Sequence, residues 1–441
     1  MTAAAKDSGE GEVVDLTREL IRIDTSNYGD GSGPGERLAA EYVAGKLDEV
    51  GLQPQLLESE PGRSTVVARW EGEDPSADAL LIHGHTDVVP AVAEDWSVHP
   101  FSGEVADGCV WGRGAVDMKD FDAMALAVVR ARIREGRKPR RPVVLVFPAD
   151  EEAGGRKGAH WLVDHHPGLL DGCTEAIGEV GGFSLTVRED LRLYLIQTAE
   201  KGMAWMRLRA TGTAGHGSMV NEDNAVTELA AAVSRIGSYQ WPLRLTTSVR
   251  AFLTELSDAL GIDLTAADEQ ELQQVVGRMG SIARMVGATL RNSTNPTMLD
   301  AGYKHNVIPG EATAGIDGRF VPGGEEEFLA TIDELLGDKV TREWVNHDIA
   351  PETEFAGALV DAMKTSLVAE DPQGRAVPFL MSGGTDAKSW SLLGIRCFGF
   401  SPLQLPPELD FVGMFHGIDE RVPTEGLRFG TRVLDRFLDI A

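Results

Sequence analysis

The sequence predicts an α/β protein with two domains. The larger domain is built on a mostly parallel central sheet flanked by helices, and a smaller α/β sandwich is inserted into it. Two observations lead to this fold. The chain has 441 residues, too many for one ordinary hydrophobic core. Short, apolar, β-branched runs also alternate with helical patterns, as in parallel sheets covered by helices on both faces.

Three buried strands are expected in the first part of the chain, at Ser64–Trp70, Ala79–His83 and Val143–Ala149. Helical patterns lie around them at Glu36–Val50 and Met118–Arg134, and a glycine follows each helix closely. In sheets of this kind, reactive groups gather beyond the carboxyl ends of the strands. Loops that follow these strands are therefore the first place to look for a site.

From about residue 200 the elements alternate over a short span, which suits a small α/β sandwich. Its expected strands and helices are Met203–Thr211, Asn224–Ile236, Glu311–Arg319, Glu325–Leu336 and Thr341–Asn346. Residues 244–292, rich in Ala, Leu, Glu and Gln, are interpreted as a helical insertion.

The pattern of the larger domain resumes after residue 350. The expected elements are a helix at Glu354–Val368, strands at Ala376–Leu380 and Arg396–Gly399, and a last helix at Glu425–Ile440. The predicted domains are thus residues 1–199 with 349–441, and residues 200–348.

Composition excludes several classes of partner. The chain has 41 basic and 69 acidic residues, so its formal charge is 41 − 69 = −28. A chain this acidic disfavours nucleic acid and anionic membrane surfaces, and no segment approaches the ~18 apolar residues of a membrane span. Cys109, Cys173 and Cys397 are few and widely spaced, which is typical of a reducing compartment. We expect a cytoplasmic protein that acts on a small molecule.

Imidazoles and carboxylates recur directly after the predicted strands. HGHTDVVP contains His85 and Asp87, GRGAVDMKD places Asp117 before a helix, and ADEEAGG contains Glu151 and Glu152. Further along, IGEVGG contains Glu179 and FHGIDERVP contains His416. Each alone has an ordinary structural explanation, such as a satisfied loop histidine or a solvated turn. Their joint occurrence in this order is what indicates a site.

This mixed set of nitrogen and oxygen ligands suits zinc, which cobalt or manganese could replace. Two divalent ions lie ~3.5–4 Å apart in paired sites, so they need a bridging carboxylate, for which Asp117 is the best placed. Asp87, two residues after His85, is placed to orient that imidazole. The adjacent Glu151 and Glu152 cannot both point the same way. One can bind metal while the other handles the protons of an attacking water.

These motifs, together with PFSGEVADGCVWGRGAVDMK and GGTDA, resemble those of the di-zinc aminoacylase and glutamate-carboxypeptidase-like metallopeptidases. The family also includes carboxypeptidase S, carnosinase-type dipeptidases and succinyl-diaminopimelate desuccinylase. The resemblance covers about residues 12 to 437 and is most specific from His83 to Lys119. Two departures stand out: Asp120 replaces a glycine common in the family, and Val-Gly-Gly follows Glu179 where desuccinylases have Pro-Thr.

The resemblance implies roles for these residues. One zinc would be held by His85, Asp117 and Glu179, and the other by Asp117, Glu152 and His416. Asp87 would orient His85, and Glu151 would be the general base toward a metal-bridging hydroxide. The family also commonly has a cis peptide after the bridging aspartate.

The resemblance also implies groups that face the substrate. His216, in TGTAGHGSMVN, would help to stabilise the oxyanion, often from the partner subunit of a homodimer formed through the small domain. Asn306 and Arg319 would contact substrate, although Arg319 could instead form an ion pair with Asp317. The backbone of Gly383 and Gly384 and the Thr385 hydroxyl would cradle a carboxylate.

The expected function is hydrolysis of an amide bond next to a free carboxylate, in an N-acyl amino acid or a short peptide. A dipeptidase or tripeptidase is the alternative, and a succinyl-diaminopimelate desuccinylase is a third. A binding protein on an inactive fold is disfavoured because all five ligand positions are filled.

Overall fold

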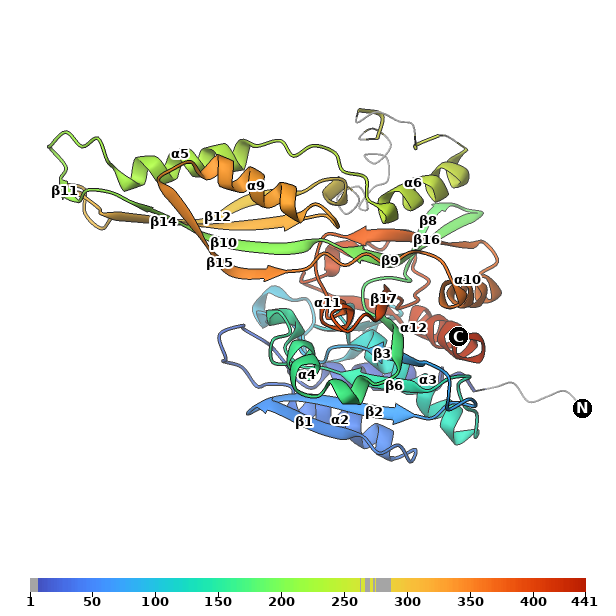
Figure 1. The fold of residues 1–441 in the computed structure, drawn as a ribbon. Helices are drawn as coiled ribbons and strands as arrows, with labels where there is room; N and C mark the ends of the chain where they lie inside the picture. Colours follow the sequence, from blue (N-terminus) through green and yellow to red (C-terminus); the bar gives the residue numbers. More distant parts are fainter. Residues whose placement is uncertain (1–6, 262, 266–269, 273, 275–286) are drawn as a thin grey trace, which may run out of the picture. The chain divides into compact units, whose positions relative to one another are not determined.

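The computed structural model describes residues 7–261, 263–265, 270–272, 274 and 287–441 (Figure 1). The chain divides into two compact units. The first unit comprises residues 1–198, 353–379 and 385–441, and the second comprises residues 199–352 and 380–384. This division places residues 199, 349–352 and 380–384 in the second unit, whereas the sequence prediction placed them in the larger domain.

The first unit is built on one sheet with the strand order β1-β2-β6-β3-β7-β17-β9-β16, and β8 pairs with β9. The four central strands β6, β3, β7 and β17 run parallel to one another. At the flanks β2 pairs antiparallel with β6 and β1, and β9 pairs antiparallel with β17. The strands are β1 Gln55–Glu60, β2 Arg63–Trp70, β3 Ala79–His83, β6 Val143–Phe147, β7 Cys173–Gly178, β8 Ser184–Arg188, β9 Leu191–Glu200, β16 Gly374–Met381 and β17 Arg396–Gly399. A separate small sheet joins β4 Glu104–Ala106, β5 Cys109–Trp111 and β18 Arg421–Pro423.

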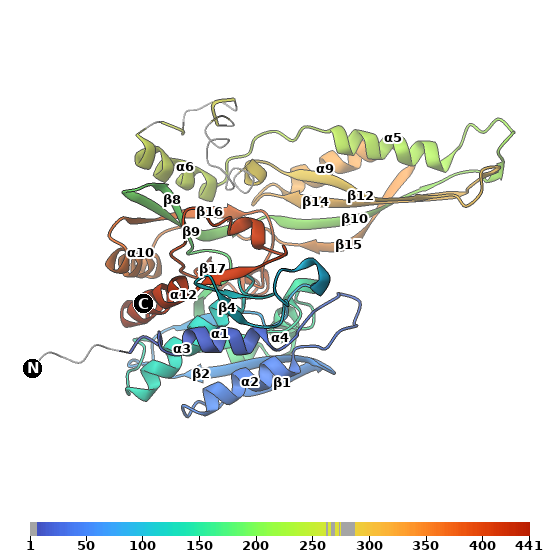
Figure 2. The same ribbon diagram turned by 180° about the vertical axis from the view of Figure 1, so that it is seen from behind.

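Helices cover both faces of the central sheet, as the two opposite views show (Figures 1 and 2). The helices α1 Val13–Ile21, α2 Arg37–Asp48 and α3 Lys119–Arg134 lie on one face, with α12 Thr424–Ile440 packed against α3 and α10 Ala358–Glu370 against α12. On the other face, α4 Ala159–His165 and α11 Ala387–Ser391 bury Leu162 and Trp390 against Leu81 and Val144. β3 and β6 are covered on both sides and buried along their whole length, and only His83 at the end of β3 is polar.

The second unit is an antiparallel sheet of order β12-β14-β10-β15, covered on one face by two helices (Figure 1). Burial alternates along β10 and β14, so one face packs against Leu229 and Phe328 of the helices. A two-stranded ribbon of β11 and β13 and a further helix, α6, complete the described part. The bounds are β10 Gly202–Thr211, β11 Gly215–His216, α5 Ala225–Ser238, α6 Thr247–Leu260, β12 Ser293–Ala301, β13 Val307–Ile308, β14 Glu311–Phe320, α9 Glu325–Leu336 and β15 Val340–Asp348.

The predicted fold class is confirmed, and several predicted boundaries differ from the structure, of which two have a clear physical reason. The strand expected to reach Ala149 ends at Phe147, before Pro148, which has no N–H to donate to the sheet. The helix expected to begin at Glu354 begins at Ala358. Arg396 accounts for the difference, because its guanidinium donates to the carbonyls of Glu354 and Ala356 and holds that segment outside the helix.

The predicted helical insertion at residues 244–292 is seen in part. Helix α6 falls within it, whereas residues 262, 266–269, 273 and 275–286 lie outside the described residues. None of the helices in the described ranges is both long and apolar enough to cross a membrane.

Lys201, at the start of the second unit, is a buried lysine whose effect on stability can be measured. Its side chain is fully buried and donates to Ser293 Oγ at 3.2 Å. Burial, with the charge of Arg319 nearby, lowers the pKa of Lys201 to about 7. The unfolded chain therefore binds a proton that the folded chain releases between pH ~7 and ~10.5, so this group makes stability rise with pH in that window.

We expect Lys201→Met to lose this rise when free energies of unfolding from urea titrations are compared at pH 7 and pH 9. The exposed Lys304→Met variant serves as the control and should keep the wild-type pH dependence. Identical pH slopes in the two variants would contradict a buried, largely neutral Lys201.

Candidate metal centre

The chemistry-bearing residues of the first unit converge at one edge of the sheet. His85 follows β3, Glu151 and Glu152 lie in a 3-10 turn (η2, Glu151–Ala153) after β6, and Glu179 follows β7. Because β6, β3 and β7 are parallel neighbours, their carboxyl ends meet at the same edge. The sheet topology alone brings these four side chains together.

Asp117 and His416 reach the same place from loops. Asp117 lies two residues before the first residue of α3, and its peptide bond to Met118 is cis, as the resemblance implied. The turn after β3 lies against this helix so closely that a Cβ on Gly84 would be 3.0 Å from Met118 Cε and would clash with Asp122 Oδ1. Glycine is therefore required there. His416 lies before β18, with its backbone in the left-handed region at φ 58°.

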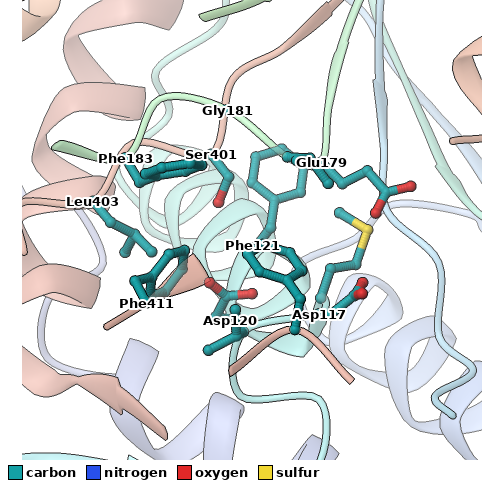
Figure 3. Close-up of a pocket in the computed structure, with 13 residues that line it drawn as sticks. Asp117, Asp120, Phe121, Glu179, Gly181, Phe183, Ser401, Leu403 and Phe411 are labelled. Carbon is teal, nitrogen blue, oxygen red and sulfur yellow. The ribbon is translucent and has the colours of Figure 1, made fainter. Parts of the chain in front are cut away.

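Four side-chain contacts among these residues define two groups of potential ligands that share Asp117. His85 Nε2 lies 3.1 Å from Asp117 Oδ1 and 3.4 Å from Glu179 Oε2. His416 Nε2 lies 3.2 Å from Asp117 Oδ2 and 3.1 Å from Glu152 Oε2. Within each group the ligand atoms all lie within 4.8 Å of one another. Figure 3 shows the Asp117 and Glu179 carboxylates on the same side of a small cavity.

These separations fit zinc. Tetrahedral zinc with bonds of ~2.0–2.1 Å to nitrogen and oxygen places neighbouring ligand atoms about 3.3 Å apart. The four imidazole–carboxylate distances range from 3.1 to 3.4 Å. The two oxygens of Asp117 face different imidazoles, as a carboxylate that bridges two ions requires.

The charges of the cluster also call for cations. Hydrogen bonds with Asp117 and Glu152 raise the pKa of His416 to about 10. Burial alone would lower the pKa of His85, but the charge of Glu179 and hydrogen bonds with Asp117 and Asp87 hold it well above its ordinary value. Both imidazoles are thus drawn toward the charged form by carboxylates that outnumber them.

The pKa values of the buried carboxylates are also raised, which for an acid favours the neutral form. Burial raises the pKa of Glu179 to about 7, against the charge of His85. Burial and the charge of Asp117 raise the pKa of Glu152, although His416 opposes them. Divalent cations would stabilise the ionised form of both groups.

Glu151 lies beside the two ligand groups without belonging to either. Its Oε2 is 3.8 Å from His85 Nε2, and its neighbour Glu152 points toward His416. Burial and the charge of Glu179 raise the pKa of Glu151 well above its ordinary value. The pair Glu151–Glu152 therefore diverges, as predicted for one ligand and one proton-transfer group.

Asp87 links the histidine to this acidic turn. The Nδ1 atom of His85 lies 3.0 Å from the Asp87 carbonyl oxygen, so the other ring nitrogen is directed to the ligand cluster. The Asp87 carboxylate accepts the backbone N–H groups of Glu151 at 3.1 Å and Glu152 at 3.2 Å. One buried side chain thus holds the turn that carries both glutamates.

A buried network behind Asp87 was missed by the sequence analysis. Asn27 donates from Nδ2 to Asp87 Oδ2 at 2.8 Å and to Asp150 Oδ1 at 3.2 Å. Its carbonyl oxygen accepts from Arg63 at 3.0 Å, and Arg63 pairs in turn with buried Glu36. No motif marks Asn27 in the sequence, because the contact depends on a loop that returns to the sheet edge.

The sequence analysis also missed a buried ion pair that joins the segments of Asp117 and His416. Glu420 is fully buried and accepts the backbone N–H groups of Val116 at 2.6 Å and Asp117 at 3.1 Å. Arg113 pairs with Glu420 at 2.7 Å and donates to the Gly417 carbonyl at 2.9 Å. Arg113 and Glu420 both lie inside the sequence motifs that carry the family resemblance. Their place in those motifs was the only sign in the sequence that they support the site.

The predicted substrate-facing residues are distributed over both units. His216 and Asn306 come together in the β11–β13 ribbon, where both are exposed and Asn306 accepts the N–H of Gly217 at 2.9 Å. His216 Nδ1 contacts Ser218 Oγ at 2.8 Å. Arg319 donates to Asp317 at 2.7 Å and lies over the Trp205 ring, so the ion pair left open by the sequence is present.

The glycine loop is divided between the units. Gly383 and Gly384 are assigned to the second unit and Thr385 to the first. The Thr385 hydroxyl accepts the N–H of Ala387 at 3.0 Å, at the start of α11.

Comparison with known proteins now identifies the family. Residues 81–440 match Peptidase family M20/M25/M40. The chain belongs to this family. It is 28% identical over 432 residues to aminoacylase-1 of Sus scrofa, covering 94% of this chain and 91% of that protein. The family and these relatives make it a metallo-hydrolase of amide or peptide bonds.

Solved structures have the same fold. An M20 family metallo-carboxypeptidase from Sulfolobus solfataricus superposes with a TM-score of 0.72 at 18% identity, over 97% of this chain and 99% of that one. The YXEP protein of Bacillus subtilis, described as a dinuclear metal binding peptidase of the M20 family, has a TM-score of 0.61 at 12% identity, over 98% of both chains.

The Arg113–Glu420 pair generates a stability prediction. Arg113→Met leaves the Glu420 carboxylate buried without its cation, so we expect the free energy of unfolding to fall by about 3–5 kcal/mol. Adding Glu420→Gln removes the orphaned charge and keeps one acceptor for the two N–H groups, so part of the loss should be recovered.

Chemical denaturation of the single and double variants measures this coupling. Arg428→Met, which breaks the exposed pair with Glu425, is the control and should cost under about 1 kcal/mol. Strictly additive losses at Arg113 and Glu420 would show that the pair does not act as a unit.

Proposed function

We propose that the protein binds two zinc ions and hydrolyses the amide bond next to a free carboxylate, in an N-acyl amino acid or a short peptide. One ion would be held by His85, Asp117 and Glu179, and the other by Asp117, Glu152 and His416. The observation that carries this proposal is the shared Asp117, whose two oxygens face two different imidazoles at 3.1 and 3.2 Å.

The residues around the two ligand groups receive distinct roles. Asp87 orients His85, because the Asp87 carbonyl and carboxylate both lie at the Nδ1 edge of the ring. Glu151 is the general base, since it lies within 3.8 Å of His85 Nε2 and is not needed by either ligand group. The zinc pair, when bound, supplies Lewis acidity and acidifies water at the site.

Proton transfer is then assigned to Glu151. Its Oε2 accepts a proton from the attacking water and later delivers it to the nitrogen of the leaving amino acid. The N–H groups of Glu151 and Glu152 are fixed by Asp87. This arrangement keeps the base and its metal-binding neighbour in a constant relation during the transfer.

Recognition of the substrate is proposed for residues of the second unit and the glycine loop. His216 would stabilise the oxyanion together with Asn306, and Arg319 with Gly383, Gly384 and Thr385 would bind the carboxylate. In support, His216 and Asn306 are neighbours in one exposed ribbon. The class of substrate is supported by the relatives, named aminoacylase-1 and metallo-carboxypeptidase.

We further propose a cytoplasmic homodimer formed through the second unit. Strand β12 is an edge strand of its sheet, and Met298 and Leu299 on it are 73% and 65% exposed. An exposed apolar edge of this kind favours pairing with a second chain. None of the three cysteines, all of them described residues, forms a disulfide bond, which suits a reducing compartment. Sedimentation velocity would separate dimer from monomer.

The two adjacent glutamates provide a matched test of the roles. Glu151→Gln should keep two zinc ions per chain and lower kcat by about 10²–10⁴-fold, because only the base is removed. Glu152→Gln should instead lower the zinc content, because it removes a ligand. Metal analysis by mass spectrometry and turnover of N-acetyl-leucine would measure both effects. Full activity in Glu151→Gln, or unchanged zinc in Glu152→Gln, would contradict the assignment.

The requirement for a free carboxylate is tested with one pair of substrates. N-acetyl-leucine and N-acetyl-leucinamide differ only in the carboxylate, so we expect kcat/KM to fall by at least about tenfold for the amide, the loss expected for one charge-assisted hydrogen bond. Equal values of kcat/KM would show that the carboxylate is not recognised.

A further inference from the structure

Three side chains meet on one face of the second unit's sheet, opposite the face that α5 and α9 cover. Successive residues of a strand point to opposite faces. Ile316 of β14 belongs to the core beneath the helices, so Asp317 and Arg319 lie on the other face. Trp205 of β10 is the cross-strand partner of Asp317, and residues directly opposite each other share a face. The register of the sheet therefore brings an indole, a carboxylate and a guanidinium together.

The Asp317 carboxylate accepts hydrogen bonds from both of its neighbours. Its Oδ1 atom accepts from Arg319 Nε at 2.7 Å and from Trp205 Nε1 at 3.0 Å, and its Oδ2 atom accepts from Arg319 Nη2 at 3.4 Å. The guanidinium also lies over the indole, with Arg319 Cζ 5.6 Å from the centre of the Trp205 ring. Arg319 is thus held in its plane by a carboxylate and on its flat face by an aromatic ring.

These contacts occupy only one edge of the Arg319 guanidinium. The group carries five N–H donors in a rigid plane. Both of its hydrogen bonds to Asp317 leave from the Nε–Nη2 edge, and within the part of the chain that the structure describes none leaves from Nη1. The Nη1–Nη2 edge keeps a parallel pair of N–H groups, which matches the two oxygens of a carboxylate. The ion pair with Asp317 and a substrate contact are therefore compatible, although the sequence presented them as alternatives.

The pair differs from an ordinary surface ion pair on the same sheet face. Arg209 of β10 pairs with Glu311 of β14, and these side chains are 46% and 47% exposed. The side chains of Arg319 and Asp317 are only 19% and 32% exposed. A long side chain that is already held in place loses less conformational freedom when a ligand binds, so its binding costs less free energy.

We propose that Asp317 and Trp205 are positioning residues for substrate recognition. They hold Arg319 so that its Nη1–Nη2 edge binds both oxygens of the carboxylate on the leaving amino acid. The inference rests on the proposed function, in which Arg319 contacts that carboxylate, and deepens it by naming the residues that set the geometry of the contact. Neither residue needs to touch the substrate in this role. A carboxamide offers this edge one acceptor oxygen instead of two, so the held guanidinium discriminates against it.

The ratio of kcat/KM for N-acetyl-leucine to that for N-acetyl-leucinamide measures this positioning in the zinc-loaded protein. Asp317→Ala should lower the ratio by about three- to tenfold, the cost of immobilising one long side chain on binding. Trp205→Leu, which removes both the ring and the N–H donor, should lower it by about two- to fivefold, the value of an exposed cation–π contact. The loss should appear mainly in KM, because the contact is the same in the ground state and the transition state.

Two further variants serve as controls. Asp317→Asn keeps an oxygen that accepts from Arg319 Nε, so it should restore most of the ratio that Asp317→Ala loses. Glu311→Ala breaks the exposed pair with Arg209 on the same sheet face and should leave the ratio at the wild-type value. The melting temperature of each variant shows whether the fold is intact.

Binding provides a readout that does not depend on turnover. In the Glu151→Gln protein, we expect calorimetry to show that an added Asp317→Ala change weakens the binding of N-acetyl-leucine by about three- to tenfold more than that of N-acetyl-leucinamide. A purely structural role of Asp317 would weaken the binding of both compounds equally.

The outcomes separate this inference from the proposed function. A wild-type ratio in Asp317→Ala or in Arg319→Met, an equal loss for both substrates, or a loss in Asp317→Asn as large as in Asp317→Ala would overturn the positioning role and leave amide hydrolysis standing. Equal kcat/KM for the two compounds in the wild type would overturn carboxylate recognition together with this inference. Failure of the zinc-loaded wild type to hydrolyse either compound, with no binding in Glu151→Gln, would overturn the proposed function itself.

Discussion

The structure depends on one carboxylate, that of Asp117. Its two oxygens lie 3.1 and 3.2 Å from imidazoles that come from opposite ends of the chain, His85 and His416. Glu179 contacts the imidazole of His85, and Glu152 contacts that of His416. Four acids, Glu151 included, thus meet two bases in a buried site, and such a cluster is stable only if further positive charge is supplied. Burial and these mutual charges together account for the shifted pKa values, and the spacing of the ligand atoms suits zinc.

Two buried hydrogen-bond networks of the first unit hold the backbone segments that carry these charged residues. Asp87 and Asn27 hold the turn of the two glutamates, and Arg113 with Glu420 holds the segments of Asp117 and His416. Backbone strain gathers at the same place. Asp150, Val180 and His416 all have φ between 53° and 68°, a region that costs non-glycine residues about 1–3 kcal/mol and persists only where the surroundings enforce it.

Much of the fold was predictable because local pattern and tertiary environment agree. Ala79–His83 and Glu325–Leu336 have the predicted bounds, since the first begins with a run of four apolar residues and the second has a clear helical period. Strand β12 was missed because seven of its nine residues are exposed, which leaves no burial pattern to read. Helix α10 begins four residues late because of Arg396, whose contacts with Glu354 and Ala356 cannot be read from local sequence.

The candidate site likewise contains residues that the sequence predicted and residues that it did not. The order of the motifs placed His85, Asp117, Glu152, Glu179 and His416 in one candidate centre, and the parallel neighbours β6, β3 and β7 explain why they converge. Asn27 and Arg63 were not predictable, because their role appears only when a loop returns to Asp87.

The central claim, two metal ions joined by Asp117, is tested most directly by anomalous diffraction from crystals of the zinc-loaded protein, recorded at the zinc absorption edge. The account predicts two anomalous peaks about 3.5–4 Å apart, one on each oxygen of Asp117. A single peak, or two peaks of which one does not contact Asp117, would contradict it.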